Sequence, residues 1–133
     1  MLQTLQARES CARGAETNTS RLVYTISGRR KPDAPWALEV NLAESRDDEW
    51  VFRRDAAITR HLGELGHVSA DSIPYVAPEI VLLFKAKMPR AKDEHDFGAA
   101  VEHLEPQARA WLGQNLARVH PNHPWLGRLG DQA

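Results

Sequence analysis

The chain has 133 residues, of which 42% are hydrophobic and 26% charged, and its formal net charge at pH 7 is -1. This composition is typical of one globular domain, and it gives no overall attraction to nucleic acid or to anionic membranes. No run approaches the roughly 18 apolar residues that a membrane-spanning helix needs. The N-terminus also lacks the apolar core of a signal peptide. We therefore expect a cytoplasmic protein that is not a channel or transporter and does not bind nucleic acid.

The chain is expected to begin with a weakly patterned segment. Residues 1–20 are predicted to be poorly ordered or helical, with any helix running from Met1 to Arg13. Residues 21–133 are predicted to form a single domain. Its strands are expected over about residues 21–58 and its helices over about residues 78–120.

The predicted strands are recognised by their β-favouring residues and their alternation. "RLVYTIS" (21–27) and "WALEVNLAES" (36–45) are the clearest, and the second places Trp36, Leu38, Val40 and Leu42 on one face. "RDDE" (46–49) predicts a tight turn before a short strand, "WVFRR" (50–54). Residues 55–66 fit either a strand or a helical turn. The expected result is a small antiparallel meander from about Leu22 to Ile58.

Three helices are predicted in the second half of the chain. Pro78 suits the first position of a helix, and Pro89 ends that helix. A second helix is expected from about Lys92 to Leu104, and a third from Pro106 to about His120. In the tail that follows, Trp125 and Leu126 are expected to dock on the helices. Strands first and helices second indicate the α+β class.

The candidate metal ligand is Glu39, in the middle of the second predicted strand. A strand holds a carboxylate stiffly, and carboxylate oxygens suit a hard cation such as magnesium. The alternative is that Glu39 faces solvent, as charged residues do on half-exposed strands.

The candidate anion-binding residues are Lys85, Lys87 and Lys92, around the predicted break at Met88-Pro89. Arg90 adds a fourth cation, and phosphate groups bind such donors. The alternative is a solvated helix junction. Lysines at a helix C-terminus and acidic residues such as Asp93 at the next N-terminus are favoured by the helix dipoles alone.

Arginine and histidine pairs are two further candidate sites. Arg53 and Arg54 are adjacent in a predicted strand, where neighbouring side chains face opposite sides. They are therefore expected to be solvated or salt-bridged rather than to form an anion clamp. His120 and His123 are separated by Pro121 and have no cysteine partner, so they do not predict a zinc site.

Six fragments in a fixed order resemble a known family: "PWALEVNL", "WVFRRDAAITRHL", "IPYVAPEIVLLFKAK", "KDEHDF", "ARAWL" and "HPWLGRL". Over about residues 23–129 the chain resembles bacterial nucleotidyltransferase-like proteins of the aminoglycoside-2''-adenylyltransferase-like family. The resemblance implies a partial polymerase-β-type nucleotidyltransferase fold, with a small, mostly antiparallel sheet followed by a C-terminal helical bundle. It also implies transfer of a nucleoside monophosphate from a nucleoside triphosphate to a hydroxyl, with magnesium as cofactor.

The resemblance assigns roles to the residues already singled out. Glu39 corresponds by position to the third of three metal-binding carboxylates, and is the implied catalytic and metal residue. Lys85 and Lys92, with Lys87 between them, would approach the triphosphate. Asp93 and Asp96 would be structural.

The sequence departs from the family pattern ahead of Glu39. It has no Gly-Gly turn followed by an Asp-x-Asp/Glu pair, and a lone carboxylate does not hold two magnesium ions. We expect a shortened, catalytically incomplete member of the family that keeps nucleotide binding. One alternative is active transfer with carboxylates from a partner or from upstream residues. Another is an interaction module in which the charged junction and the Trp125 tail bind a protein. The acceptor and the oligomeric state are not predicted.

Overall fold

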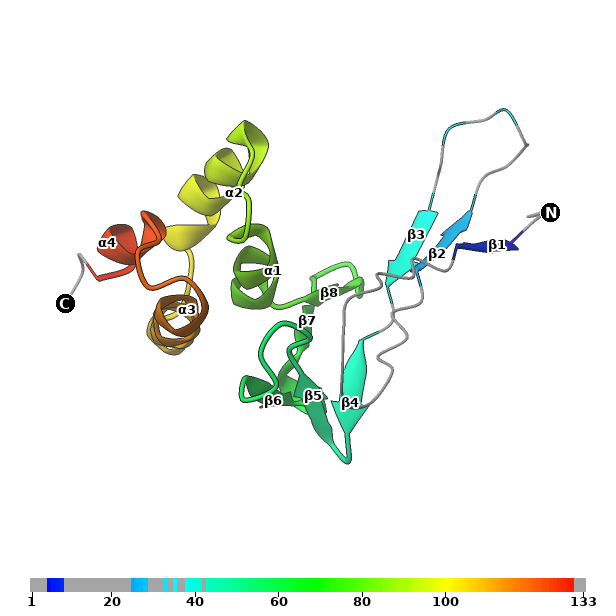
Figure 1. The fold of residues 1–133 in the computed structure, drawn as a ribbon, viewed down its shortest axis with the longest axis horizontal. Coiled ribbons are helices and arrows are strands. Elements are labelled where there is room, and N and C mark those ends of the chain that lie inside the picture. The colour runs from blue at the N-terminus through cyan, green and yellow to red at the C-terminus, as the bar shows by residue number, and fades with distance from the viewer. Residues whose placement is uncertain are drawn as a thin grey trace, which may run out of the picture. The chain divides into compact units, whose positions relative to one another are not determined.

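The computed structural model describes residues 5–8, 25–28, 33, 35, 38–41 and 43–130. The chain forms two compact units, Met1–Glu44 and Ser45–Ala133 (Figure 1). Strands are the only regular elements among the described residues of the first unit, whereas the second combines short strands with helices. The α+β class predicted from the sequence is confirmed.

The first unit contains a three-stranded antiparallel sheet in the order β1-β2-β3. The strands are β1 (Leu5–Arg8), β2 (Thr25–Gly28) and β3 (Leu38–Asn41). Ile26 of β2 lies opposite Val40 of β3, and Ser27 lies opposite Glu39. Strand β1 occupies part of the segment in which the sequence allowed a helix from Met1 to Arg13, so that interpretation is wrong for these four residues.

A second sheet of three strands has the order β4-β5-β6. Its strands are β4 (Glu44–Arg46), β5 (Glu49–Val51) and β6 (Thr59–His61). The turn between β4 and β5 is the predicted "RDDE" turn, and Asp47 adopts a φ of 51° there. Aspartate is one of the few residues other than glycine that visits this left-handed region readily. For residues 55–66 the sequence fitted either a strand or a helical turn. The structure contains both, since β6 is followed by a 3-10 helix at Leu62–Glu64.

A separate hairpin joins β7 (Gly66–Val68) to β8 (Pro74–Val76). Glycine is required at position 66, because a Cβ there would lie 2.4 Å from the carbonyl oxygen of Tyr75. The hairpin leaves apolar side chains in solvent, with Val68 67% and Ile73 61% exposed. The sequence predicted only an extended approach to the first helix here. The predicted single meander is therefore wrong, since the strands divide into three small sheets.

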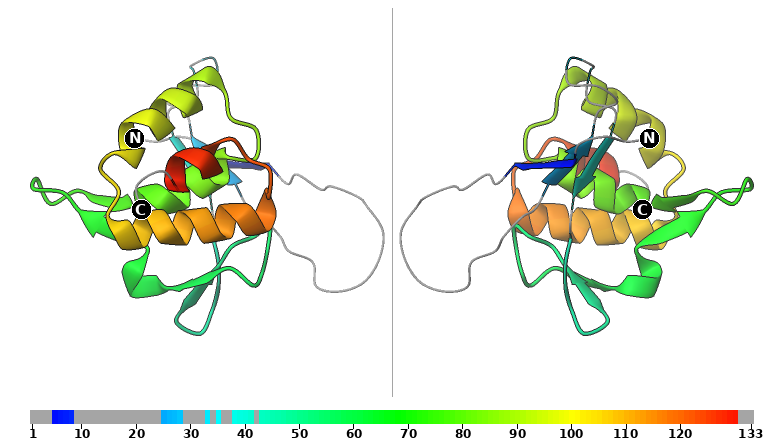
Figure 2. Two further views of the ribbon diagram at one scale, coloured as in Figure 1. Left: turned by 90° about the vertical axis from the view of Figure 1, so that its left-hand side faces the viewer. Right: turned by 90° about the vertical axis from the view of Figure 1, so that its right-hand side faces the viewer.

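Four helices complete the second unit: α1 (Pro78–Lys85), α2 (Ala91–Val101), α3 (Pro106–Val119) and α4 (Trp125–Gly130). Proline stands at the first position of α1 and of α3, where its missing N–H costs nothing. Helix α3 lies against both α1 and α4 (Figure 2). The first three helices confirm the sequence prediction, whereas α4 was expected only as a docking tail.

One hydrophobic core unites the strands and helices of the second unit. Phe52, just after β5, and Phe84 of α1 meet edge to face with ring centroids 4.9 Å apart. Phe97 of α2 and Trp125 of α4 stack in parallel planes with centroids 4.2 Å apart. Both rings of that stack are almost completely buried. The predicted docking of Trp125 is thus confirmed, and it links the end of the chain to α2.

None of the helices in the described part of the chain is long and apolar enough to cross a membrane.

The stack of Phe97 on Trp125 predicts a large cost for truncating Phe97. Phe97→Ala leaves a cavity under the indole ring, so the free energy of unfolding should fall by about 3–5 kcal/mol. Met88→Ala is the control, because Met88 is 80% exposed and its truncation should change the free energy by less than about 0.5 kcal/mol. Urea unfolding followed by far-UV circular dichroism measures both values. Equal unfolding midpoints for the two variants would contradict this account of the core.

Candidate functional site

The candidate site is the junction between α1 and α2, which we call the charged junction and define by Lys85, Lys87, Arg90, Lys92, Asp93 and Asp96. Helix α1 ends at Lys85, and Pro89 keeps the chain out of a helix until α2 begins at Ala91. The two helix ends therefore place a lysine-rich C-terminus beside an aspartate-rich N-terminus.

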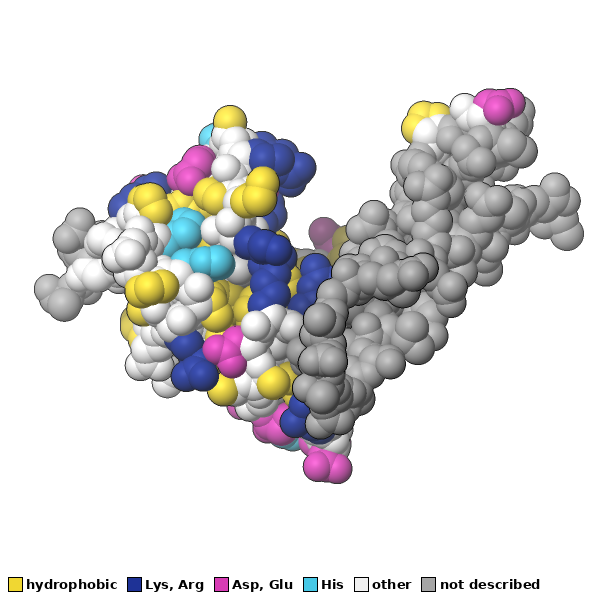
Figure 3. Space-filling model, viewed as in Figure 1, with side chains coloured by type: hydrophobic (Ala, Val, Ile, Leu, Met, Phe, Trp, Pro, Cys, Tyr) yellow, Lys and Arg dark blue, Asp and Glu magenta, His cyan; other side chains and the backbone are white. Residues whose placement is uncertain are grey.

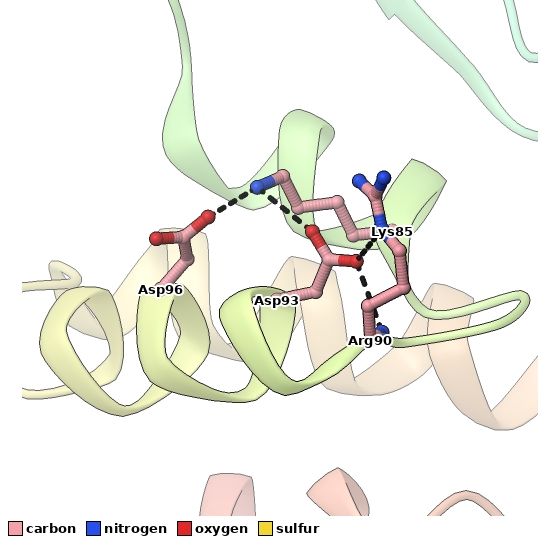
Figure 4. Close-up of polar contacts among 4 residues, drawn as sticks. All are labelled: Lys85, Arg90, Asp93 and Asp96. Carbon is pink, nitrogen blue, oxygen red and sulfur yellow. Dashed lines mark hydrogen bonds and ion pairs between the residues drawn. The ribbon is translucent and has the colours of Figure 1, made fainter.

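Lys85 reaches from the last turn of α1 to two carboxylates on α2 (Figure 4). Its Nζ forms an ion pair with Asp96 Oδ2 and lies 3.2 Å from Asp93 Oδ1. The second contact lacks the alignment of a hydrogen bond, so Asp93 Oδ1 is held by charge alone. Lys85 is thus committed to a bridge between the helices.

Asp93 is the most buried charge of the charged junction, with its side chain 3% exposed. Its Oδ2 accepts hydrogen bonds from Arg90 Nε at 2.9 Å and from the backbone N–H of Arg90 at 3.0 Å. The backbone contact is one half of a capping box at the start of α2. Two cations and one N–H therefore offset the cost of burying this carboxylate.

These contacts shift the pKa values of all the paired groups. Hydrogen bonding from Arg90, together with the contact from Lys85, holds the pKa of Asp93 far below its usual range against the opposite effect of burial. The hydrogen bond from Lys85 lowers the pKa of Asp96. In return Asp96, and then Asp93, raise the pKa of Lys85 against the opposite effect of burial. The network therefore remains fully ionised at neutral pH.

The other predicted site residues are placed differently. Lys87 lies just after α1 and Lys92 in the first turn of α2, and both side chains are exposed. Neither makes a hydrogen bond or an ion pair with another described residue, although Lys92 adds to the positive charge near Asp96. Glu39 lies in β3 of the first unit, and its side chain is outside the described structure.

The strand predicted at Arg53 and Arg54 is wrong, whereas both side chains are exposed, in agreement with the predicted solvation. Strand β5 ends at Val51, so Arg53 and Arg54 lie in a turn and do not alternate across a strand. Both guanidinium groups lie over the ring of Phe84, at 5.3 and 5.4 Å from its centroid. Arg54 also donates Nη1–H to the carbonyl oxygen of Phe84, at 2.9 Å. Both arginines therefore serve the same surface at the end of α1.

Two histidines after α3 approach the same helix end. His123 Nδ1 accepts the backbone N–H of Trp125 at 3.2 Å, so its Nε2 carries the proton that it donates to the carbonyl oxygen of Ala86 at 2.9 Å. The ring of His120 lies 6.1 Å from that of His123. Burial, and then the electrostatic effects of the nearby His123, Arg54 and Lys87, lower the pKa of His120.

Sequence reasoning missed two ion pairs that lie outside the charged junction. Arg60 binds the buried Glu79 at 2.6 Å and lies 5.0 Å from the ring centroid of Trp111. Arg118 binds Asp55 at 2.5 Å, across 63 positions of sequence. No periodicity connects residues so far apart. A glutamate directly after the proline that starts an apolar helix was the only local signal for Glu79.

The carboxylates of the charged junction do not fit a role as magnesium ligands. Asp93 is enclosed by Arg90 and Lys85, and Asp96 faces Lys85, so cations of the protein already occupy the positions that a metal would take. Within the described ranges, no group of three or more histidine, cysteine, aspartate or glutamate side chains is placed to hold a metal ion.

No family model, curated protein or solved structure matches this chain. The resemblance to nucleotidyltransferase-like proteins therefore stays a prediction from the sequence.

The charged junction predicts acid-sensitive stability that depends on Asp93. Arg90 and Lys85 hold its folded-state pKa below the unfolded value, which is about 3.9. Its stabilising effect is therefore complete above that value and is lost as the pH falls toward the folded-state pKa. Asp93→Asn should lower the melting temperature near pH 7. The drop in melting temperature between pH 7 and about pH 3 should also be smaller in this variant than in the parent chain.

The control for this prediction is Asp71→Asn, because Asp71 is exposed in the turn of the β7–β8 hairpin. It should leave the melting temperature almost unchanged at neutral pH. If Asp93→Asn loses as much stability between the two pH values as the parent chain, then Asp93 is not the acid-sensitive group.

Proposed function

We propose that this chain is a nucleotidyltransferase-like domain that binds a nucleoside triphosphate and does not transfer the nucleotide by itself. The observation that supports binding is that the lysines of the charged junction have different roles. Lys85 is used to join α1 to α2, whereas Lys87 and Lys92 stay exposed on either side of the break. Exposed lysines on a firmly braced junction are suitable partners for phosphate oxygens.

The proposal revises one role that the resemblance implies. Lys85 would have to abandon both Asp93 and Asp96 to reach a triphosphate, and one of these, Asp93, is buried. Leaving a buried carboxylate without its cation is costly. Lys85 is therefore a positioning residue in this proposal, and the phosphate contacts belong to Lys87 and Lys92.

The absence of transfer is proposed from the carboxylates. The sequence has no Asp-x-Asp/Glu pair ahead of Glu39, and the aspartates of the charged junction are paired with Lys85 and Arg90. Phosphoryl chemistry needs metal ions to balance the charge of the transferred group. Binding without turnover is the behaviour that this set of residues supports best.

The interaction-module alternative loses one of its two elements. Trp125 was one half of the expected partner surface, but its side chain is 1% exposed and stacks on Phe97. Its Nε1–H also donates to Glu94 Oε2 at 2.9 Å. A tryptophan so fully used within the chain is not available to a partner.

The proposed function predicts saturable binding of ATP in the presence of magnesium chloride, measured by isothermal titration calorimetry. Lys87→Gln and Lys92→Gln should each weaken binding by about tenfold, the equivalent of ~1.4 kcal/mol. Arg128→Gln removes one positive charge from α4, outside the charged junction, and should leave the affinity unchanged. Incubation with labelled ATP and an aminoglycoside should give no nucleotide transfer. No binding by the parent chain would refute the proposal, and transfer by the purified chain would refute its second half.

A further inference from the structure

Two cations, Arg54 and Lys87, and two histidines lie near the C-terminal end of α1. Arg54 donates to the carbonyl oxygen of Phe84, and His123 donates to that of Ala86. Lys87 is the next residue along the chain, and His120 lies beside His123. Lys and Arg side chains and histidines lie next to one another on this face of the molecule (Figure 3).

The helix end explains only part of this charge. A helix C-terminus carries the equivalent of about half a negative charge, and Arg54 alone more than balances it. Lys87 adds a second full charge. The acidic residue next to Arg54 does not offset the surplus, because Asp55 is bound by Arg118 at 2.5 Å and by the backbone N–H of Ala57 at 3.0 Å.

The surplus of positive charge contributes to lowering the pKa values of Arg54 and His120. Burial and the neighbouring Arg53 lower the pKa of Arg54. Burial lowers the pKa of His120, and His123, Arg54 and Lys87 lower it further. Like charges that disfavour one another in this way are relieved by a bound anion, and such arrangements concentrate at functional sites.

We propose that Arg54, Lys87 and His120 form a binding site for a di- or triphosphate group at the C-terminal end of α1. A guanidinium offers paired donors to phosphate oxygens, and a lysine adds a point charge. His120 gains a proton when the anion binds, since the phosphate charge favours its imidazolium form. The ordered turn that holds Arg54 against Phe84 positions one donor before the ligand arrives.

This site extends the proposed function but can be tested apart from it. The triphosphate of a nucleotide is one source of the anion, and inorganic pyrophosphate is another. Lys87 belongs to both proposals. Arg54 and His120 belong only to this one, and Lys92 belongs only to the proposed function.

The test titrates the full chain with inorganic pyrophosphate and, separately, with ATP. Affinity is measured by calorimetry, and the imidazole signals of His120 are followed by NMR across pH. Pyrophosphate should bind, and it should move the titration midpoint of His120 upward. His120→Gln and Arg54→Gln should each weaken pyrophosphate binding by about tenfold, while Arg128→Gln should leave it unchanged.

The variants separate the site from folding and from the proposed function. Arg54→Gln also removes a bond to Phe84, whereas the side chain of His120 makes no hydrogen bond within the described part of the chain. The His120 variant is therefore expected to disturb the fold less than the Arg54 variant.

If pyrophosphate does not bind, or if His120→Gln and Arg54→Gln both bind it as the parent does, this inference is overturned. ATP binding that depends on Lys92 but not on Arg54 or His120 would overturn it and leave the proposed function intact. Pyrophosphate binding at Arg54 and His120 without ATP binding would support this inference and refute the proposed function.

Discussion

The second unit depends on the ion pairs of Lys85 with Asp93 and Asp96, which tie α1 to α2 across the break at Pro89. The break removes helical hydrogen bonding between the two segments, so their relation has to be fixed by side chains. A buried aspartate fixes it firmly, because Asp93 is stable in this environment only while Arg90 and Lys85 stay in place. The stack of Phe97 on Trp125 then connects α2 with α4.

The same network decides which cations of the charged junction are available to a ligand. The charge of Lys85 is balanced by Asp93 and Asp96, whereas the side chains of Lys87 and Lys92 are exposed. Near the same end of α1, Arg54 donates to the carbonyl oxygen of Phe84, and burial together with the nearby charges of Arg54 and Lys87 lowers the pKa of His120. Lys85 thus belongs to the structural part of this lysine-rich segment through the buried Asp93, whereas Lys87 and Lys92 are its exposed part.

Much of the second unit could be predicted from its sequence. Proline at 78 and 106, and the spacing of Phe97, Val101 and Leu104, predicted the helices and their buried faces, since these signals are local. The three small sheets could not be predicted, because alternation identifies a strand but not its partner. The turn at Arg53 and Arg54 was missed for a related reason. β5 stops at Val51, and nothing local in "WVFRR" signals that end.

Ion pairs between residues far apart in the sequence also could not be predicted. Arg118 and Asp55 meet only because α3 packs near the turn after β5, and the sequence carries no sign of that contact. For the same reason, the sequence predicted a ligand-binding role for Lys85, whereas the structure pairs it with Asp93 and Asp96. The sequence showed lysines and aspartates close together, and only the three-dimensional structure showed which of them pair.

A double-mutant cycle between Lys85 and Asp93 tests this account most directly. The unfolding free energies of Lys85→Met, Asp93→Asn and the double variant would be measured by urea denaturation at neutral pH. If the two residues stabilise the junction as a pair, the double variant will lose clearly less stability than the two single losses added together. Strictly additive losses would show that Lys85 and Asp93 act independently, and would contradict the central claim.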